Sequence, residues 1–198
     1  MKTRLFALIL AGSLFFCLSA CSGKEKSAVN FSRGTVSDYV YTNSFAGITL
    51  SLSEEWKIYS DEEIADVYGE PTVYDENGAM VDCYDFIAQN TDGSSVTITY
   101  ENLGFLYGID MSEEDYLELT LENLRSQMAE IYEGCVCEMG EISVSGKTVP
   151  CVFASVEIEG FEIWNSLVVK KVGDVMAVIS VGAVSGETIA EIFGRLSL

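Results

Sequence analysis

The chain of 198 residues contains no histidine, the residue that proteins most often use as a general base near neutral pH. Ser-His-Asp and Cys-His catalytic arrangements are therefore excluded, and so are mixed Cys/His zinc sites. A Ser-Lys pair would need a lysine of lowered pKa, but Lys147, Lys170 and Lys171 fall at predicted strand ends and turns. Glycine-rich phosphate-binding patterns are also absent. We expect no enzyme of these classes, no catalytic residue among them and no cofactor.

Basic residues are scarce: 11 Lys and Arg stand against 31 Asp and Glu, which gives a formal net charge of −20. Such a chain is repelled by phosphate backbones and by anionic lipid surfaces. The composition excludes nucleic acid as a partner. Solubility outside the cell is the simplest reason for the charge.

Long apolar runs are also missing, with one exception near the start of the chain. Lys2 and Arg4 precede an apolar run, Leu5 to Leu18, that is too short for a transmembrane helix. A charged start, an apolar stretch and small residues at its end are typical of a secretory signal. We therefore expect export.

The signal ends in Leu18-Ser19-Ala20-Cys21, which resembles the lipobox of bacterial lipoproteins. The resemblance implies cleavage after Ala20 and a diacylglycerol group on the Cys21 sulfur. It predicts a signal peptide over residues 1–20, a lipidated cysteine with a flexible tether over 21–37, and a single α/β domain over 38–198. The membrane would be a partner through this anchor, with the domain on the extracytoplasmic face. Two acyl chains hold a protein stably to a bilayer.

Four cysteines remain in the predicted domain, and each lies in an apolar, strand-like run. An even number in an exported protein permits disulfides, with three connectivities. In apolar runs, however, free cysteine behaves as a small hydrophobic residue. We favour buried thiols over bridges for Cys83, Cys135, Cys137 and Cys151.

Periodicity predicts an α+β domain. Ser60 and Ser112 begin amphipathic helices with acidic first turns, and Ser185 begins a last helix that includes Leu196. Alternating or continuous apolar runs separated by turn residues predict antiparallel strands. The expected fold is an antiparallel sheet of about six to eight strands with helices on both faces. The expected strands cover residues 36–41, 48–52, 72–74, 80–88, 96–101, 135–144, 148–158, 161–170 and 175–184.

The segment Phe45 to Trp56, FAGITLSLSEEW, resembles the F-x-G-I-x-F-x-L-P-x-x-W opening of PsbP-like domains. The resemblance implies an α/β/α sandwich, and the order of elements over residues 39–198 is similar. Ser53 stands where that pattern has proline. No catalytic residue accompanies the resemblance, because the opening is structural.

The carboxylates show no complete catalytic or metal-binding pattern. Asp82 and Asp85 are three positions apart on one predicted strand, so they should point to opposite faces. Asp75-Glu76-Asn77-Gly78 has its glycine too early for an EF-hand loop and is typical of a hairpin turn. We expect no metal site.

Gly104 to Gly108 places Phe105 and Tyr107 between two glycines, outside predicted elements. Such a segment either folds back onto the core or offers an apolar patch to a partner. Trp56 could contribute to the same contact. The acidic helix that begins at Ser112 is the alternative contact face. We therefore expect a non-catalytic binding or accessory module, whose partner is an envelope protein or a ligand. The alternative is a carboxylate-based enzyme acting on cell-wall or dietary glycans, and a third reading is a structural envelope protein without a small ligand.

Overall fold

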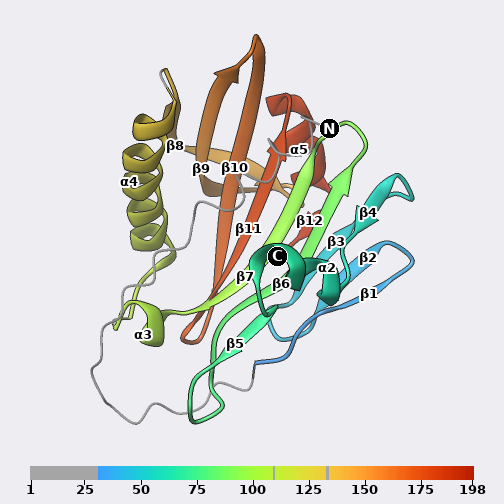
Figure 1. Cartoon of the computed structure of the whole chain (residues 1–198), viewed down its shortest axis with the longest axis vertical. Coiled ribbons are helices and arrows are strands. Elements are labelled where there is room, and N and C mark those ends of the chain that lie inside the picture. Colours follow the sequence, from blue (N-terminus) through green and yellow to red (C-terminus); the bar gives the residue numbers. More distant parts are fainter. Residues whose placement is uncertain (1–30, 109, 133) are drawn as a thin grey trace.

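The computed structural model describes residues 31–108, 110–132 and 134–198 (Figure 1). The predicted signal peptide and Cys21 lie outside the described residues. Within them, two antiparallel sheets and four helices form an α+β fold, which confirms the predicted fold class. The helices are α2 (Asp61–Tyr68), α3 (Leu103–Leu106), α4 (Glu113–Ile131) and α5 (Gly186–Gly194).

The larger sheet has eight strands. At one edge, two short strands, β4 and β5, pair with opposite ends of the long strand β6. The strands are, in spatial order, β4 (Trp56–Ile58) and β5 (Thr72–Tyr74), then β6 (Met80–Asn90), β7 (Ser95–Asn102), β11 (Val175–Ala183), β10 (Phe161–Val172), β9 (Lys147–Ile158) and β8 (Val136–Val144).

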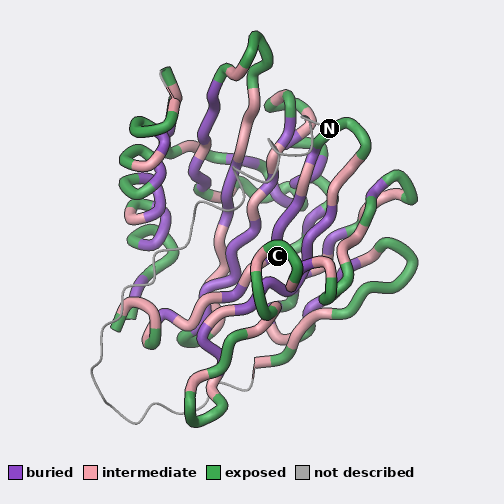
Figure 2. Tube along the Cα trace, viewed as in Figure 1, coloured by how far each residue is buried: buried purple, intermediate pink, exposed green. Residues whose placement is uncertain are grey.

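Both faces of the larger sheet are covered (Figure 2). Helix α4 packs on β8, β9 and β10 through its predicted apolar stripe, and α2 lies over β6 on the same face through Ile64. Helix α5 and the small sheet cover the opposite face. This explains why β11 is apolar at nearly every position.

The small sheet was not expected as a separate sheet. It joins β1 (Thr35–Ser37), β2 (Val40–Asn43), β3 (Ile48–Ser51) and β12 (Leu196–Ser197). The strand predicted over residues 36–41 is interrupted, because Asp38 and Tyr39 adopt positive φ values of 50° and 63°. The prediction that Leu196 belongs to the last helix is wrong: α5 ends at Gly194, and Leu196 pairs with Leu50. An apolar residue such as Leu196 is buried whether it ends a helix or lies in a strand, so the spacing of apolar residues alone does not distinguish the two.

The predicted helix starts are confirmed. Ser60 and Ser112 each form a capping box, in which the serine side chain accepts from the backbone N–H three residues later. In α4 the Asp115 N–H donates to Ser112 Oγ at 3.1 Å, and the Ser112 N–H donates back to Asp115 Oδ2 at 3.2 Å. The Ser185 side chain caps α5. These caps satisfy backbone donors that an isolated helix leaves unpaired.

Among the residues that the structure describes, no helix combines the length and hydrophobicity that a transmembrane span requires.

Candidate functional site

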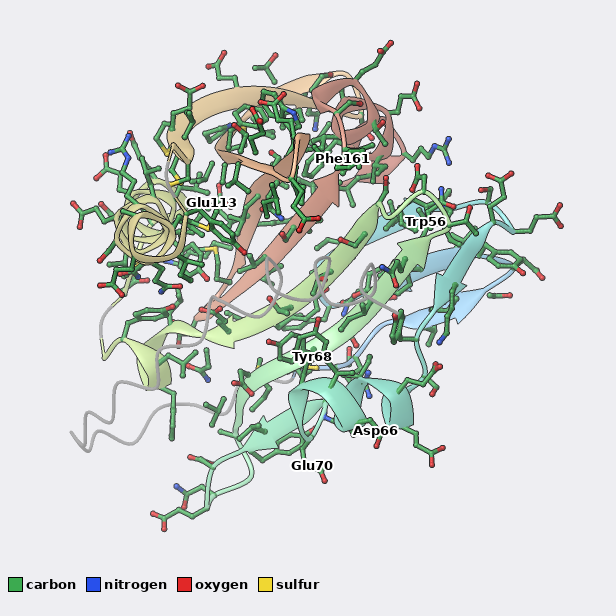
Figure 3. All side chains as sticks on the ribbon, turned by 45° about the horizontal axis from the view of Figure 1, so that its top comes forward. Trp56, Asp66, Tyr68, Glu70, Glu113 and Phe161 are labelled. Atoms are coloured by element: carbon green, nitrogen blue, oxygen red, sulfur yellow. The ribbon has the colours of Figure 1, made fainter. Side chains whose placement is uncertain are left out.

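The structure separates the three side chains predicted for partner contact. Trp56 lies on β4, only 4 % exposed, and packs in the core (Figure 3). It pairs with Asn90 at one end of β6, whereas α3 lies at the other end of that strand. Phe105 on α3 is 48 % exposed, and Tyr107 just beyond it is half-buried. A contact role for these three residues stays a prediction, and Phe105 is the accessible one.

Helix α3 is fixed to the end of the sheet by its first residues. The Asn102 side chain accepts from the Phe105 N–H at 3.2 Å and donates to the Met80 carbonyl at 3.0 Å. The buried Leu103 donates its N–H to the Asp174 carbonyl at 2.8 Å. These bonds join β6, β7 and the β10–β11 turn. They hold α3 in a position where the Phe105 side chain is left exposed.

Glu101 and Asp82 form a pair of carboxyl groups beside α3. They are cross-strand neighbours on β7 and β6. The Tyr107 hydroxyl donates to Glu101 Oε2 at 2.8 Å, and its ring meets the Tyr116 ring edge-on at 6.0 Å. Burial raises the pKa of Glu101, and so does the nearby Asp82 charge, although hydrogen bonds from Tyr107 and Tyr116 oppose the shift. Burial likewise raises the pKa of Asp82. In the described part of the chain, neither carboxyl group has an ion-pair partner.

A second polar site lies between the two sheets, around Asp85. We call it the Asp85 cluster; its members are Asp85, Arg33, Gly34, Tyr41 and Asn43. The Asp85 side chain has no exposed surface. Its Oδ1 accepts from Arg33 Nε at 3.0 Å, and its Oδ2 accepts from the Gly34 N–H at 2.7 Å, the Tyr41 hydroxyl at 2.6 Å and Asn43 Nδ2 at 3.0 Å. These donors satisfy both oxygens of the buried carboxyl group.

A bulge in β6 lies at the Asp85 cluster. The register shifts between Tyr84 and Phe86, so Asp85 and Phe86 both face the small sheet. Asp82 faces the α2 side, as the odd spacing predicts. No signal in the sequence identified the partners of Asp85, because they lie 42 to 52 positions away along the chain. The position of Asp85 inside a largely apolar predicted strand was the one indication in the sequence of a buried polar site.

Arg33 connects the Asp85 cluster to α2. Its guanidinium donates to both oxygens of Asp61, at 2.7 and 2.8 Å, in addition to Asp85. Hydrogen bonding to Asp61 is the largest contribution to a raised pKa of Arg33, and burial opposes it. The predicted tether therefore contacts the domain in its last residues.

Gly34 is required by a close approach. A Cβ atom there would lie 2.4 Å from the Tyr41 ring. The glycine lets the backbone N–H reach Asp85 beside that ring. The cluster thus depends on both the charge and the small size of its members.

The four cysteines of the domain are free thiols. Burial is the main cause that raises the pKa of Cys83 to about 12 and that of Cys151 to about 11. A nucleophilic thiol needs the opposite shift. Cys83, Cys137 and Cys151 are buried and act as small core residues, whereas Cys135 is half-buried. No group of three or more Cys, Asp or Glu side chains within the described ranges is placed to hold a metal ion.

No protein-family model matches the chain, and no curated protein matches it. Several solved structures are similar in fold. The cyanobacterial PsbP protein CyanoP of Synechocystis is 9% identical, with 91% of this chain and 98% of that chain covered and a TM-score of 0.44. LpqN of Mycobacterium tuberculosis, described as involved in cell envelope biogenesis, is 14% identical, with coverage of 76% and 82% and a TM-score of 0.41.

A protein from Bacteroides thetaiotaomicron is 11% identical, with 80% of this chain covered and a TM-score of 0.40. The match spans about half of that protein, 47% of its length. At identities this low, the likeness concerns the fold alone.

Proposed function

We propose that this chain is an extracytoplasmic lipoprotein, held to a membrane by diacylglycerol on Cys21, whose folded domain is a non-catalytic binding or accessory module. The observation that carries the proposal is Leu18-Ser19-Ala20-Cys21 directly after a charged start and an apolar run. The acidic surface suits a soluble domain held outside the cell.

The contacts of the tether support this proposal. Phe31, Arg33 and Gly34 pack on the domain, so only residues 22–30 separate the described structure from Cys21. An anchor at Cys21 would therefore keep the domain close to the bilayer. Such a position suits an accessory module that works on membrane-associated partners.

The chemistry of the described residues also supports a non-catalytic role. Burial raises the pKa of the Cys83 and Cys151 thiols, and Asp85 is saturated with donors from the protein itself. Phe105 is the accessible residue in the segment predicted for partner contact. Binding through exposed side chains needs no activated group.

Membrane fractionation tests the anchor. The wild-type chain, Cys21→Ala and Cys17→Ala would be expressed in a bacterial host and separated into membrane and soluble fractions. We expect Cys21→Ala to leave the membrane fraction, and Cys17→Ala, whose change lies within the signal, to remain there. Equal distribution of wild type and Cys21→Ala would contradict the proposal.

In-cell crosslinking tests the accessory role. We expect a discrete crosslinked species with wild type that is lost in Cys21→Ala. Cys17→Ala, whose change lies within the predicted signal, is the matched control and should keep the species. A species that persists equally in Cys21→Ala would contradict an accessory role at the membrane.

The Asp82–Glu101 pair gives the glycan-hydrolase alternative its one specific support. A general acid needs a carboxyl group of raised pKa, and both groups have one. Turnover of cell-wall glycan fragments that is abolished by Glu101→Gln or Asp82→Asn, with the fold intact, would establish that alternative. Absence of turnover by the wild-type chain would leave the binding module.

A further inference from the structure

The first described residue shows where the tether meets the domain. The Phe31 ring packs against Phe45, with centroids 5.4 Å apart, and against Tyr100, at 5.2 Å. Tyr100 is two positions before the end of β7 at Asn102. The tether therefore joins the domain near the end of the larger sheet where β7 finishes.

Exposed aromatic side chains lie at this same end. Antiparallel pairing brings together the end of β7, the start of β6 and the β10–β11 turn, and α3 follows β7 directly (Figure 1). Phe105 on α3 is 48 % exposed, and Tyr74, paired with Met80 at the start of β6, is 57 % exposed. We call this the α3 end of the sheet.

The length of the tether limits how far this end can move from the anchor. Cys21 and Phe31 are ten positions apart, and a chain of that length spans at most about 36 Å. Strand β10, with 12 residues, is about 40 Å long. An anchor at Cys21 would therefore hold the α3 end nearer to the bilayer than the opposite end.

We propose that the α3 end faces the membrane and that Phe105 and Tyr74 contact the lipid interface. The proposal rests on the lipid anchor proposed above. Aromatic side chains favour the boundary between headgroups and acyl chains, because their rings are apolar and tolerate a wet edge. The occupant of this surface is thus the bilayer to which Cys21 is attached.

Acidic side chains at the same end limit the depth of the contact. Asp75 and Glu76 lie in the β5–β6 turn, Asp174 lies in the β10–β11 turn, and Asp110 pairs with Lys171. Carboxylates stay hydrated and are repelled by anionic lipids. We therefore expect a shallow contact that weakens as the share of anionic lipid increases.

Two single-tryptophan additions test the orientation. Phe105→Trp places a reporter at the α3 end, and Phe161→Trp places one at the start of β10, next to the β9–β10 turn at the opposite end (Figure 3). Phe161 is the more exposed of the two, at 72 %, so it is a demanding control. Each full-length lipoprotein is purified from membranes and reconstituted in phosphatidylcholine vesicles with brominated acyl chains. Quenching is compared with that of the wild-type chain, which carries Trp56 and Trp164 throughout.

We expect Phe105→Trp to lose emission in brominated vesicles, and Phe161→Trp to match the wild-type chain. Tyr74→Trp, a second variant at the α3 end, should behave like Phe105→Trp, and it replaces that variant if Phe105→Trp does not fold. Equal quenching at both ends, quenching only at Phe161, or quenching at neither end would overturn the orientation. The intact mass of each sample separates the two proposals. If lipid on Cys21 is present without quenching, only the orientation fails; if lipid is absent, both fail.

Discussion

Asp85 and Glu101 are carboxyl groups on neighbouring strands of one sheet, in opposite environments. Asp85 accepts hydrogen bonds from a guanidinium, a backbone N–H, a phenol and an amide. Glu101 has phenols for partners and a second carboxyl group, Asp82, as its cross-strand neighbour. Burial with a cation and aimed N–H groups stabilises a charge, whereas burial beside another acid favours the neutral form.

The difference separates a structural site, the Asp85 cluster, from a site that is sensitive to pH, the one around Glu101. The Asp85 cluster joins the last residues of the predicted tether, the small sheet and the larger sheet, so its strength fixes where that tether meets the domain. The Glu101 site lies beside α3, at the surface we assign to the bilayer. We expect changes at Asp85 to affect the whole fold and changes at Glu101 to affect the pH dependence of stability.

The largest effect is expected for Asp85→Asn. An amide of the same shape removes the negative charge and turns a donor toward other donors, which should lower the free energy of unfolding by about 3–5 kcal/mol. Urea unfolding at neutral pH measures the change, with Asp92→Asn in the exposed β6–β7 turn as the control. Equal stabilities of the two variants would show that the Asp85 cluster is dispensable.

Gly34→Ala should have the next largest effect, because the new Cβ would lie 2.4 Å from the Tyr41 ring. Overpacking of this kind costs about 1–3 kcal/mol. Gly194→Ala is the matched control, because a Cβ there has nothing within 4 Å and alanine favours the helix. The same urea experiment compares the two, and a neutral Gly34→Ala would contradict the close contact.

Glu101→Gln should change how stability depends on pH. Burial raises the Glu101 pKa above its ordinary value of 4.5 in the folded chain, so folding favours the protonated carboxyl. Its contribution is fully present below pH 4.5 and is lost as the pH rises through the folded pKa. The variant should therefore gain stability relative to wild type as the pH rises from 4 to 7. Unfolding measured over that range, with exposed Glu114→Gln as the control, tests this; a difference independent of pH would refute it.

Tyr107→Phe should have the smallest effect. It removes the hydroxyl that donates to Glu101 and keeps the ring against Tyr116, so the loss of stability should be about 1 kcal/mol. The pKa of Glu101 should rise further, because an ionised carboxylate loses a donor. Carbon-13 NMR titration of the glutamate carboxyl groups reads this directly, and Tyr74→Phe, an exposed position, is the control. An unchanged Glu101 titration would show that the Tyr107 hydroxyl does not affect the pKa of Glu101.

The sequence predicted the elements whose pattern is local. The stripe of α4, its Ser112 cap and the continuously apolar β11 follow from spacing and from the need to cover both faces of a sheet. The small sheet and the Asp85 cluster could not be predicted this way. They depend on contacts such as Leu196 with Leu50 and Arg33 with Asp85, which join distant parts of the chain. Trp56 shows the same limit, since its type permits a surface contact and the fold buries it.

The intact mass of the wild-type protein extracted from bacterial membranes tests the central claim most directly. A lipoprotein anchored through Cys21 has lost residues 1–20 and carries the added mass of a diacylglycerol group on that cysteine. Fragmentation should place the whole addition on the first residue. An N-terminus at another position, or an unmodified Cys21, would contradict the anchor and with it the proposed orientation of the α3 end.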